Sequence, residues 1–273
     1  MDYKLPKRKE ISNKSTYGKV LNIAGSDYMP GAAYLSSISA LKIGCGYCFL
    51  LSGERVINSV ASKTSNVVFA PYSQLNQHLK NSDVVSIGCG LSTNYNAEKL
   101  FLKVIKNVDD NKKLVIDADG INLLAKHQEK FKKLRLKNFV LTPHPKEAQR
   151  LLGFAEISDI VSNSEFYARK ISEEYGCVTV LKTHKTVVTA PDGKFYKNTT
   201  GNNSMAKAGS GDVLTGMISG LIAQGMDIFE ASCLGVYLHG LCGDLAKEDL
   251  SSYCVMADDL ISYIPKAIKI FQN

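Results

Sequence analysis

The sequence predicts an α/β fold, with a mostly parallel central sheet and helices on both of its faces. Short apolar runs typical of buried strands alternate with segments of helical periodicity along the chain. Small-residue or acidic turns follow several of these runs directly, as they do where crossover helices join parallel strands. The strand-like runs are 20–24, 47–51, 66–70, 83–87, 113–116, 139–141, 178–182 and 187–190.

Length and composition describe one ordinary globular domain, which we expect to span residues 1–273. The 273 residues are 45% hydrophobic and 22% charged, which is enough to build a sizeable core. The net charge of +7 is spread along the chain, with local clusters at 7–9 and 130–137. We therefore expect no nucleic-acid partner. Residues 1–16 are polar and charged, and we expect a flexible N-terminal segment or one that lies across a neighbour.

The cysteines and the apolar segments indicate the cellular compartment in which we expect the protein to act. The 7 scattered cysteines and an N-terminal segment without an apolar core fit a reducing cytoplasm. Cys45 and Cys48 form a CGYC motif inside the apolar run 43–51, which we interpret as a buried strand rather than a redox or zinc site. No run reaches the roughly 18 apolar residues that span a bilayer, so no membrane partner is expected.

The first strand, 20–24, is followed by a turn and a helix of small residues. The turn contains Gly25, Ser26 and Asp27, and the helix begins near Gly31, Ala32 and Ala33 and ends at Gly44. In an open α/β sheet this turn faces the ligand crevice, where small side chains let a bulky ligand come close. Close packing of the helix against its strand explains the same residues equally well.

Two later strands end in residues suited to ligand binding. The run 83–87 leads into the glycine turn 88–92, and the run 113–116 leads into Asp117 and Asp119. Either acid could hold Mg2+ through water, because this ion prefers few carboxylates together with phosphate oxygens. Capping of the following helix is the other explanation for Asp119. The sequence therefore does not assign the residues that bind the metal.

A histidine follows the run 139–141 in a loop stiffened by prolines. His144 stands between Pro143 and Pro145, and Pro145 suits the first turn of a helix. The ring is therefore held rigidly at the crevice edge. There it either contacts a ligand or is an ordinary surface or core residue.

The second half of the chain continues the alternation. An amphipathic segment at 158–175 precedes the run 178–182, and the loop 183–186 separates that run from the next, 187–190. Pro191, Asp192 and Gly193 then predict a hairpin turn. The closing helices, 228–247 and 257–270, are apolar on one side and are expected to cover the sheet.

The stretch 201–216, GNNSMAKAGSGDVLTG, combines a glycine-rich loop, an acid and a helix start. Asp212 lies at the first turn of an apolar helix, directly after Gly209, Ser210 and Gly211. Amides at such a helix end lack partners and favour an anion, and glycines allow its close approach. Asp212 is therefore either a general base beside bound phosphate or only an N-terminal cap.

Taken in order, the motifs of this chain resemble the ribokinase-like superfamily and, within it, the ADP-dependent NAD(P)H-hydrate dehydratase family. The similarity covers nearly the whole chain from Tyr17 onward, and the order of the motifs is more specific than any one of them. They are GSDYMPGAA, IGCGLS, IDADGINLL, LTPHPKEAQRLLG, VLKTHKTV and GNNSMAKAGSGDVLTGMISG.

The resemblance implies a three-layer ribokinase-like fold and a lyase that repairs damaged cofactors. Such an enzyme uses ADP to return hydrated NADH or NADPH to the intact cofactor, with release of AMP and phosphate, and is typically a magnesium-dependent homotetramer. The implied hydrate site is Ala33, Gly90, His144 and Asp212. The implied nucleotide site is Lys182, Thr183, His184, Lys185, Thr186 and Gly211.

The resemblance agrees with the interpretation of Asp212, in the glycine-rich stretch 201–216, as a general base beside bound phosphate. Asp212 would take the proton of the ring hydroxyl as it attacks the terminal phosphoryl of ADP. Mg2+ and an anion hole formed by the amides of Ala208, Gly209, Ser210 and Gly211 would stabilise the developing charge. Cys89 stands where the family usually has proline, and Thr183 where it commonly has glycine. The second departure bears on the choice between ADP and ATP.

Two other functions fit the same features. One is a ribokinase-like kinase that phosphorylates a hydroxyethylthiazole or hydroxymethylpyrimidine alcohol, for which a stable phosphorylated product would be diagnostic. The other is a catalytically inactive nucleotide-binding regulator, which would bind ADP tightly without consuming it.

Overall fold

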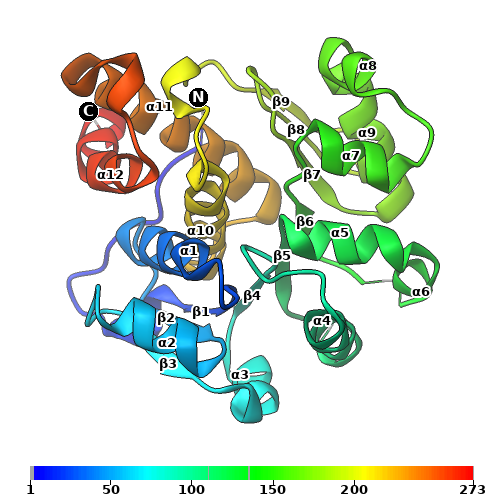
Figure 1. Ribbon diagram of the computed structural model, residues 1–273. Coiled ribbons are helices and arrows are strands. Elements are labelled where there is room, and N and C mark those ends of the chain that lie inside the picture. The colour runs from blue at the N-terminus through cyan, green and yellow to red at the C-terminus, as the bar shows by residue number, and fades with distance from the viewer. Residues whose placement is uncertain (1–2, 110, 135, 273) are drawn as a thin grey trace.

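A nine-stranded sheet forms the centre of the computed structural model, which describes residues 3–109, 111–134 and 136–272 (Figure 1). The strand order is β3-β2-β1-β4-β5-β6-β7-β8-β9. Strands β1 to β7 are parallel, whereas β8 is antiparallel to β7 and to β9. The strands are β1 Lys19–Ile23, β2 Tyr47–Leu51, β3 Val68–Ala70, β4 Val84–Ile87, β5 Lys113–Ile116, β6 Phe139–Leu141, β7 Val178–Leu181, β8 Val187–Thr189 and β9 Phe195–Lys197.

Helices cover both faces of the sheet, which confirms the predicted three-layer α/β fold. One apolar cluster joins one face to α1, α2, α10, α11 and α12, and a second joins the other face to α3 through α9. The α-helices are α1 Pro30–Lys42, α2 Glu54–Ala61, α3 Leu75–Asn81, α4 Tyr95–Asn107, α5 Asp119–Lys126, α6 Gln128–Lys133, α7 Pro145–Leu152, α8 Ile157–Ser162, α9 Ser164–Tyr175, α10 Ser210–Ala223, α11 Ile228–Cys254 and α12 Ala257–Gln272. Short 3-10 helices lie at Lys14–Tyr17, Tyr72–Gln74 and Asn203–Met205.

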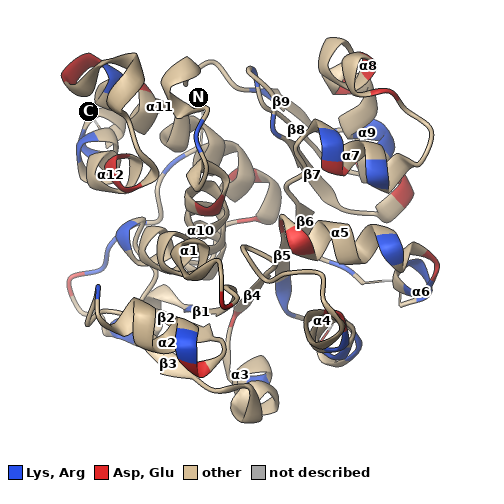
Figure 2. Ribbon diagram, viewed as in Figure 1, with Lys and Arg blue, Asp and Glu red and all other residues tan. Residues whose placement is uncertain are grey.

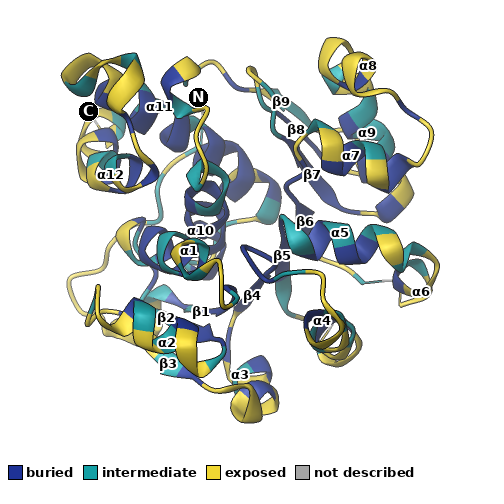
Figure 3. Ribbon diagram, viewed as in Figure 1, coloured by how far each residue is buried: buried dark blue, intermediate teal, exposed yellow. Residues whose placement is uncertain are grey.

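Strand residues alternate between the two faces, as buried parallel strands do when helices cover both sides. In β1, Val20 faces the first cluster while Leu21 and Ile23 face the second. Figure 3 shows the central strands and α10 as deeply buried elements, with exposed residues on the outer sides of the surrounding helices. The core therefore lies in two layers, one on each side of the sheet.

The sheet changes winding direction between β1 and β4, which are neighbours although β2 and β3 lie between them in sequence. Ligands of open α/β sheets bind at the carboxyl ends of strands near such a switch. At this edge the Gly25 amide donates to the Cys89 carbonyl over 2.8 Å, which ties the loops after β1 and β4 together. The switch thus places two predicted glycine turns side by side.

Small residues allow α10 to lie unusually close to α1. A Cβ atom on Gly216 would come within 2.0 Å of Ser39 Oγ, and one on Gly220 within 2.6 Å of the Ala40 carbonyl oxygen. Larger side chains there would push the two helices apart. This contact sets where the N-terminal end of α10 meets the sheet edge (Figure 1).

Several predicted elements differ from those observed. The segment 158–175 is broken at Asn163 into α8 and α9. Helix α11 extends to Cys254, with a non-helical residue at Ser251, beyond the predicted end at 247. Helix α11 packs on strands of the sheet, as predicted. Helix α12 was predicted to cover the sheet as well, but it packs mainly on α11, α1 and α10. The predicted hairpin is confirmed, because β8 and β9 pair across the turn at 191–193.

The N-terminal segment lies along its own domain where it is described. The Arg8 guanidinium stacks on the Tyr17 ring, 3.9 Å from its centroid, and also donates to the Gly44 carbonyl. The first two residues of the predicted segment 1–16 lie outside the described residues. Basic side chains are distributed over several elements, α6 and α9 among them (Figure 2).

The cysteines are free thiols, and all except Cys254 are buried. Cys48 lies in β2 and burial raises the pKa of its thiol to about 12, which agrees with the interpretation of the CGYC motif as part of a buried strand. Among the described residues, no helix combines the length and apolar character needed to cross a membrane.

Candidate active site

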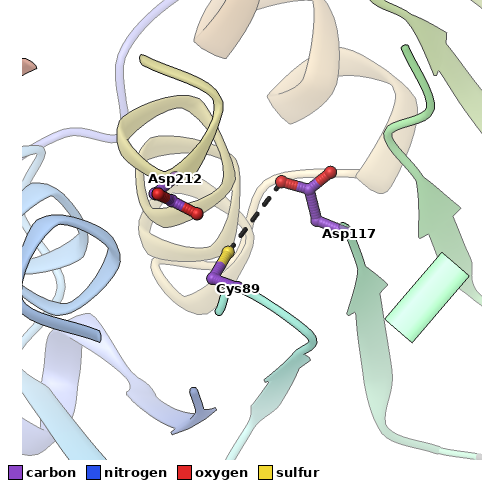
Figure 4. Close-up of side chains that lie close together, drawn as sticks. All are labelled: Cys89, Asp117 and Asp212. Atoms are coloured by element: carbon purple, nitrogen blue, oxygen red, sulfur yellow. Dashed lines mark hydrogen bonds between the residues drawn. The ribbon is translucent and has the colours of Figure 1, made fainter. Parts of the chain in front are cut away.

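Three side chains from distant parts of the chain meet at the carboxyl edge of the sheet. Cys89 follows β4, Asp117 follows β5, and Asp212 projects from the first turn of α10 (Figure 4). The sulfur of Cys89 and one carboxylate oxygen from each aspartate lie within 4.8 Å of one another. The cluster therefore joins two strand ends to a helix N-terminus.

Asp212 is the third residue of α10 and is not its cap. Gly209 takes the N-cap position in a left-handed conformation, with φ of 93°, and no side chain caps the helix. The carboxyl group is thus free for another role. Burial, followed by the nearby charge of Asp117, raises the pKa of Asp212 to about 6. A carboxylate with this pKa is ionised at neutral pH yet basic enough to accept a proton.

Asp117 is fully buried and paired. Its Oδ1 lies 2.6 Å from Lys182 Nζ, and its Oδ2 accepts a hydrogen bond of 2.6 Å from Thr215 Oγ1. Burial alone would raise the pKa of Asp117, but the Lys182 ammonium outweighs it and the pKa is lowered. Burial also opposes the charge on Lys182, and the Asp117 carboxylate reverses this, so the pKa of Lys182 is raised. Both groups are therefore ionised.

Lys182 stands at the end of β7 and brings a positive charge to the start of α10. Its amide donates to the Pro143 carbonyl over 2.8 Å, which holds the strand end against the proline loop. Its Nζ lies 3.4 Å from the place where a Cβ on Gly211 would be. A side chain at position 211 would therefore touch the ammonium and fill part of the space between it and the helix end.

The backbone at the start of α10 offers unpaired donors. Within the described part of the chain, no protein oxygen accepts from the amides of Gly211 or Asp212. The Ser210 amide instead donates to the Lys207 carbonyl over 3.3 Å, and Ala208 is exposed in the preceding turn. Of the four predicted anion-hole residues, Ser210 therefore has its amide paired, whereas Gly211 lies beside Lys182 with its amide unpaired among the described residues, and Asp212 is an additional donor.

His239 lies beneath this helix end, on α11. Its Nε2 is 3.4 Å from Ser210 Oγ, and burial lowers the pKa of the ring to about 4. The imidazole is thus neutral at physiological pH. Neither His239 nor the pairing of Asp117 with Lys182 follows from sequence spacing, because their partners are far away along the chain.

His144 caps α7. Its Nδ1 accepts from the amides of Lys146 and Glu147, and the Glu147 carboxylate accepts from the His144 amide over 2.8 Å. Burial, followed by the charge of Lys182, lowers the pKa of His144, and burial raises the pKa of Glu147 to about 7. The ring keeps 46% of its side-chain surface exposed, so capping leaves part of it accessible.

Ala33 and Gly90 lie where α1 begins beside the β4–α4 loop. The Ala33 side chain is fully buried in the core beneath this turn. Gly90 has a φ of 60°, and a Cβ there would come within 2.8 Å of Ala32 Cβ. Gly90 therefore lets the loop and the helix start touch, whereas Ala33 supports them from below.

The loop after β7 contains the other predicted nucleotide residues. Thr183 Oγ1 donates to the Lys185 carbonyl over 2.9 Å, and Thr186 Oγ1 donates to the Thr183 carbonyl over 3.3 Å. The side chains of His184 and Lys185 are exposed. The loop is thus closed by its own hydrogen bonds directly beside Lys182.

Asp119 is not the cap of α5, because Ala118 holds that position. One oxygen of Asp119 accepts from the Ser92 amide over 2.8 Å, and the other accepts from Asn122 Nδ2 over 3.3 Å. The carboxylate joins the loops after β4 and β5.

The cluster of Cys89, Asp117 and Asp212 does not fit Mg2+ as a direct ligand set. Mg2+ prefers oxygen ligands, and the thiol is soft. Both oxygens of Asp117 are already used, and the ammonium beside them repels a cation. The positive charge in direct contact with this cluster is that of Lys182.

Comparisons with known proteins all identify the same family of enzymes as similar to this chain. The NAD(P)H-hydrate dehydratase family matches residues 20–266. The chain is 37% identical to the ADP-dependent (S)-NAD(P)H-hydrate dehydratase of Neisseria meningitidis over 245 residues, which are 88% of this chain and 81% of that protein. Identity to the enzyme of the same name from Bacillus subtilis is 32%, over 98% of this chain and 95% of that one.

Solved structures agree. The ADP/ATP-dependent NAD(P)H-hydrate dehydratase of Bacillus subtilis, co-crystallised with ATP and Mg2+, superposes with a TM-score of 0.84 at 29% identity, covering 98% of this chain and 94% of that one. The chain spans about half of larger relatives: it covers 53% of a bifunctional NAD(P)H-hydrate repair enzyme from Thermofilum pendens, at 34% identity over 98% of this chain. A hydroxyethylthiazole kinase from Pyrococcus horikoshii, with a TM-score of 0.67 and 12% identity over 93% of this chain and 89% of that one, shares the fold.

Proposed function

The chain belongs to the NAD(P)H-hydrate dehydratase family, and on that premise we propose that it is an ADP-dependent dehydratase that restores NADH or NADPH from their hydrates. The observation that supports this proposal most directly is the arrangement of charged groups and amides at the start of α10. A carboxyl group with a pKa of about 6 lies at a helix end where, among the described residues, the amides of Gly211 and Asp212 are unpaired, and the partly buried ammonium of Lys182 lies nearby. Such a site combines a base with an anion-binding surface.

Asp212 is the proposed general base. It accepts the proton of the ring hydroxyl as that oxygen attacks the terminal phosphoryl of ADP, which breaks the bond to AMP. The product is a phosphorylated hydrate. Its phosphate is a better leaving group than hydroxide, and the ring nitrogen's lone pair expels it to leave an iminium ion. Loss of a proton from the adjacent ring carbon to solvent then restores the carbon–carbon double bond of the intact cofactor. The overall products are the intact cofactor, AMP and phosphate.

The amides of Gly211 and Asp212 and the Lys182 ammonium are proposed to bind the transferred phosphoryl group. These donors are fixed before the substrates arrive, so they stabilise developing negative charge with little reorganisation. Asp117 acts through Lys182: it keeps the ammonium charged and aimed at the helix end. We therefore assign Asp117 as a positioning residue.

We propose that the remaining site residues bind their ligands on either side of Asp212. We propose that Lys182, Thr183, His184, Lys185, Thr186 and Gly211 hold the nucleotide, with Ala208, Gly209 and Ser210 shaping the turn beneath its phosphates. Ala33, Gly90, His144 and Asp212 then border the hydrate. Mg2+ is proposed to enter with the nucleotide phosphates and water, since the Cys89 cluster does not suit it.

The family resemblance supports three further proposals. The chain acts as one domain of residues 1–273, works in the cytoplasm and forms a homotetramer. Sedimentation of the purified protein tests the last of these, and a species of any other size contradicts it.

A product assay tests the proposed reaction. The protein is mixed with NADH hydrate, Mg2+ and ADP, and the absorbance of reduced nicotinamide, AMP and inorganic phosphate are followed together. We expect all three to appear in equal amounts. A stable phosphorylated compound without regeneration of the cofactor would identify a kinase instead, and tight ADP binding with no product would identify a regulator.

A further inference from the structure

The thiol of Cys89 points toward the two carboxylates of the candidate active site, and the roles proposed above leave it unused (Figure 4). Its sulfur and one carboxylate oxygen from each of Asp117 and Asp212 lie within 4.8 Å of one another. Cys89 is 1% exposed, so protein groups rather than bulk water surround the sulfur. A buried thiol this close to the proposed base bears on how that base ionises.

The turn that carries Cys89 is fixed by its backbone. A Cβ on Gly88 would come within 2.0 Å of the Asp117 carbonyl oxygen, so the turn after β4 approaches the end of β5 more closely than a larger residue would allow. On the other side, the Cys89 carbonyl accepts from the Gly25 amide over 2.8 Å. These contacts set the position of the sulfur relative to Asp212.

The thiol keeps its proton and is therefore a donor. Burial, followed by the charges of Asp212 and Asp117, raises the pKa of Cys89, so the sulfur is protonated near neutral pH. A thiol has a single hydrogen, which rotates about the bond between Cβ and sulfur while the heavy atoms stay in place. The S–H group of Cys89 can thus turn toward either carboxylate.

The two carboxylates differ in their need for this donor. Asp117 Oδ2 lies 3.9 Å from the sulfur and already accepts from Thr215 Oγ1 over 2.6 Å. Lys182 also balances the charge of Asp117. Within the described residues, Asp212 forms no ion pair, and the Cys89 thiol is the side chain that hydrogen-bonds to it. A hydrogen bond from the thiol therefore stabilises an ionised Asp212 more than it stabilises Asp117.

The thiol opposes the groups that keep the proposed base protonated. Burial, followed by the charge of Asp117 at the end of β5, raises the pKa of this base to about 6, and Asp119 at the start of α5 raises it further. The hydrogen bond from Cys89 and the charge of Lys182 lower it. His239 on α11 is neutral at physiological pH and adds no charge. Cys89 is thus one of two side chains that favour the ionised form.

We infer, on the basis of the proposed function, that Cys89 is a positioning residue for the base: its S–H group donates to the Asp212 carboxylate, keeps it ionised and holds one of its oxygens. When Asp212 takes the proton of the ring hydroxyl, the S–H group turns to Asp117 instead. The sulfur gains and loses no proton in this cycle. Cys89 therefore acts on the reaction only through Asp212.

Titration of the carboxyl groups tests this assignment without nucleotide, hydrate or Mg2+. The protein is labelled with 13C in its aspartate carboxyl groups, and the signal of Asp212 is the one that Asp212→Asn removes. Cys89→Ala should raise the pKa of Asp212 by about 0.5–1 pH unit, because a weak hydrogen bond to the ionised form is lost. Cys89→Ser supplies a donor again and should return this pKa to the wild-type value or below. Cys48→Ala shortens another buried cysteine, in β2, and is the matched control.

The same shift should appear in the reaction. In Cys89→Ala the acid limb of the pH profile of kcat/KM for NADH hydrate should move to higher pH. Near pH 6 the value should fall about two- to fivefold, because less of the base is ionised there. Well above that pH it should stay close to the wild type. Cys89→Ser should recover the wild-type profile, which a purely structural role of the side chain would not explain.

The outcomes separate the two proposals. An unchanged or lowered pKa of Asp212 in Cys89→Ala would overturn the inference. Equal shifts in the alanine and serine variants would assign the effect to packing and would overturn it as well. If the titrations behave as expected but the wild type never regenerates the cofactor, the proposed reaction fails and the hydrogen bond from Cys89 to Asp212 stands.

Discussion

Lys182 Nζ lies 2.6 Å from Asp117 Oδ1, although 65 residues separate the two in sequence. The pair lies at the carboxyl ends of β7 and β5, with Asp117 buried and Lys182 partly buried, and Thr215 of α10 donates to the other oxygen of Asp117. One carboxylate therefore ties the nucleotide side of the sheet edge to the helix that carries the proposed base.

The first prediction concerns this ion pair. Lys182→Met should lower the free energy of unfolding by about 3–5 kcal/mol, because it leaves the Asp117 carboxylate buried without a counter-charge. Asp117→Asn/Lys182→Met removes both charges and should recover most of that loss in urea unfolding. If Lys182 binds the phosphoryl group, the double variant stays inactive. Recovery of activity together with stability would show that the ammonium is only structural.

The second prediction separates two roles of His144. His144→Ala should cost about 1 kcal/mol of stability, because the amides at the start of α7 lose their acceptor. His144→Asn supplies a capping oxygen and should restore thermal stability. If the ring also contacts the hydrate, the asparagine variant keeps a raised KM for NADH hydrate. A normal KM in that variant would limit His144 to capping.

The third prediction follows from the raised pKa of Asp212. Its pKa is 3.8 when unperturbed and about 6 in the fold, so the folded state binds the proton more tightly and its stability decreases as pH rises through this interval. Asp212→Asn cannot ionise, so at pH 7 it should be more stable than the wild type by about 1–3 kcal/mol. The difference should vanish near pH 3. A variant less stable than the wild type at neutral pH would contradict the raised pKa of Asp212.

The fourth prediction concerns the thiols. Burial, followed by the charges of Asp212 and Asp117, raises the pKa of Cys89, so this thiol should resist alkylation. Cys254 is the exposed cysteine and should react with iodoacetamide first. Mass spectrometry of the native protein, compared with the denatured one in which all 7 react, gives the order. Rapid labelling of Cys89 in the native protein would show that the site opens far more than the structure indicates.

The sequence predicts the sheet well for a physical reason. Buried parallel strands are nearly all apolar, and the turns that follow them are small or acidic, so both the strands and the ligand edge can be located locally. The break at Asn163 between α8 and α9 could not be predicted, because no proline or glycine lies near it in the sequence. Helix α12 has the same one-sided apolar pattern as a sheet-covering helix, yet its partners are other helices.

The site is predictable only where its chemistry is local. Asp212 and Gly211 stand out because a helix start and a glycine turn occur together. The partner of Asp117 depends on which strands are neighbours, which the order of β4 to β7 decides and spacing does not. His239 lies in an apolar helix, and only the packing of α11 against α10 brings it to Ser210.

The central claim is that the Asp212 carboxylate removes the hydroxyl proton during phosphoryl transfer. The most direct measurement is single-turnover dehydration of NADH hydrate by Asp212→Asn, with ADP affinity measured in the same preparation. We expect the rate to fall by at least ~100-fold while ADP binding is retained, and the wild-type rate to fall as pH drops below about 6. Near-normal turnover by the asparagine variant would contradict the account.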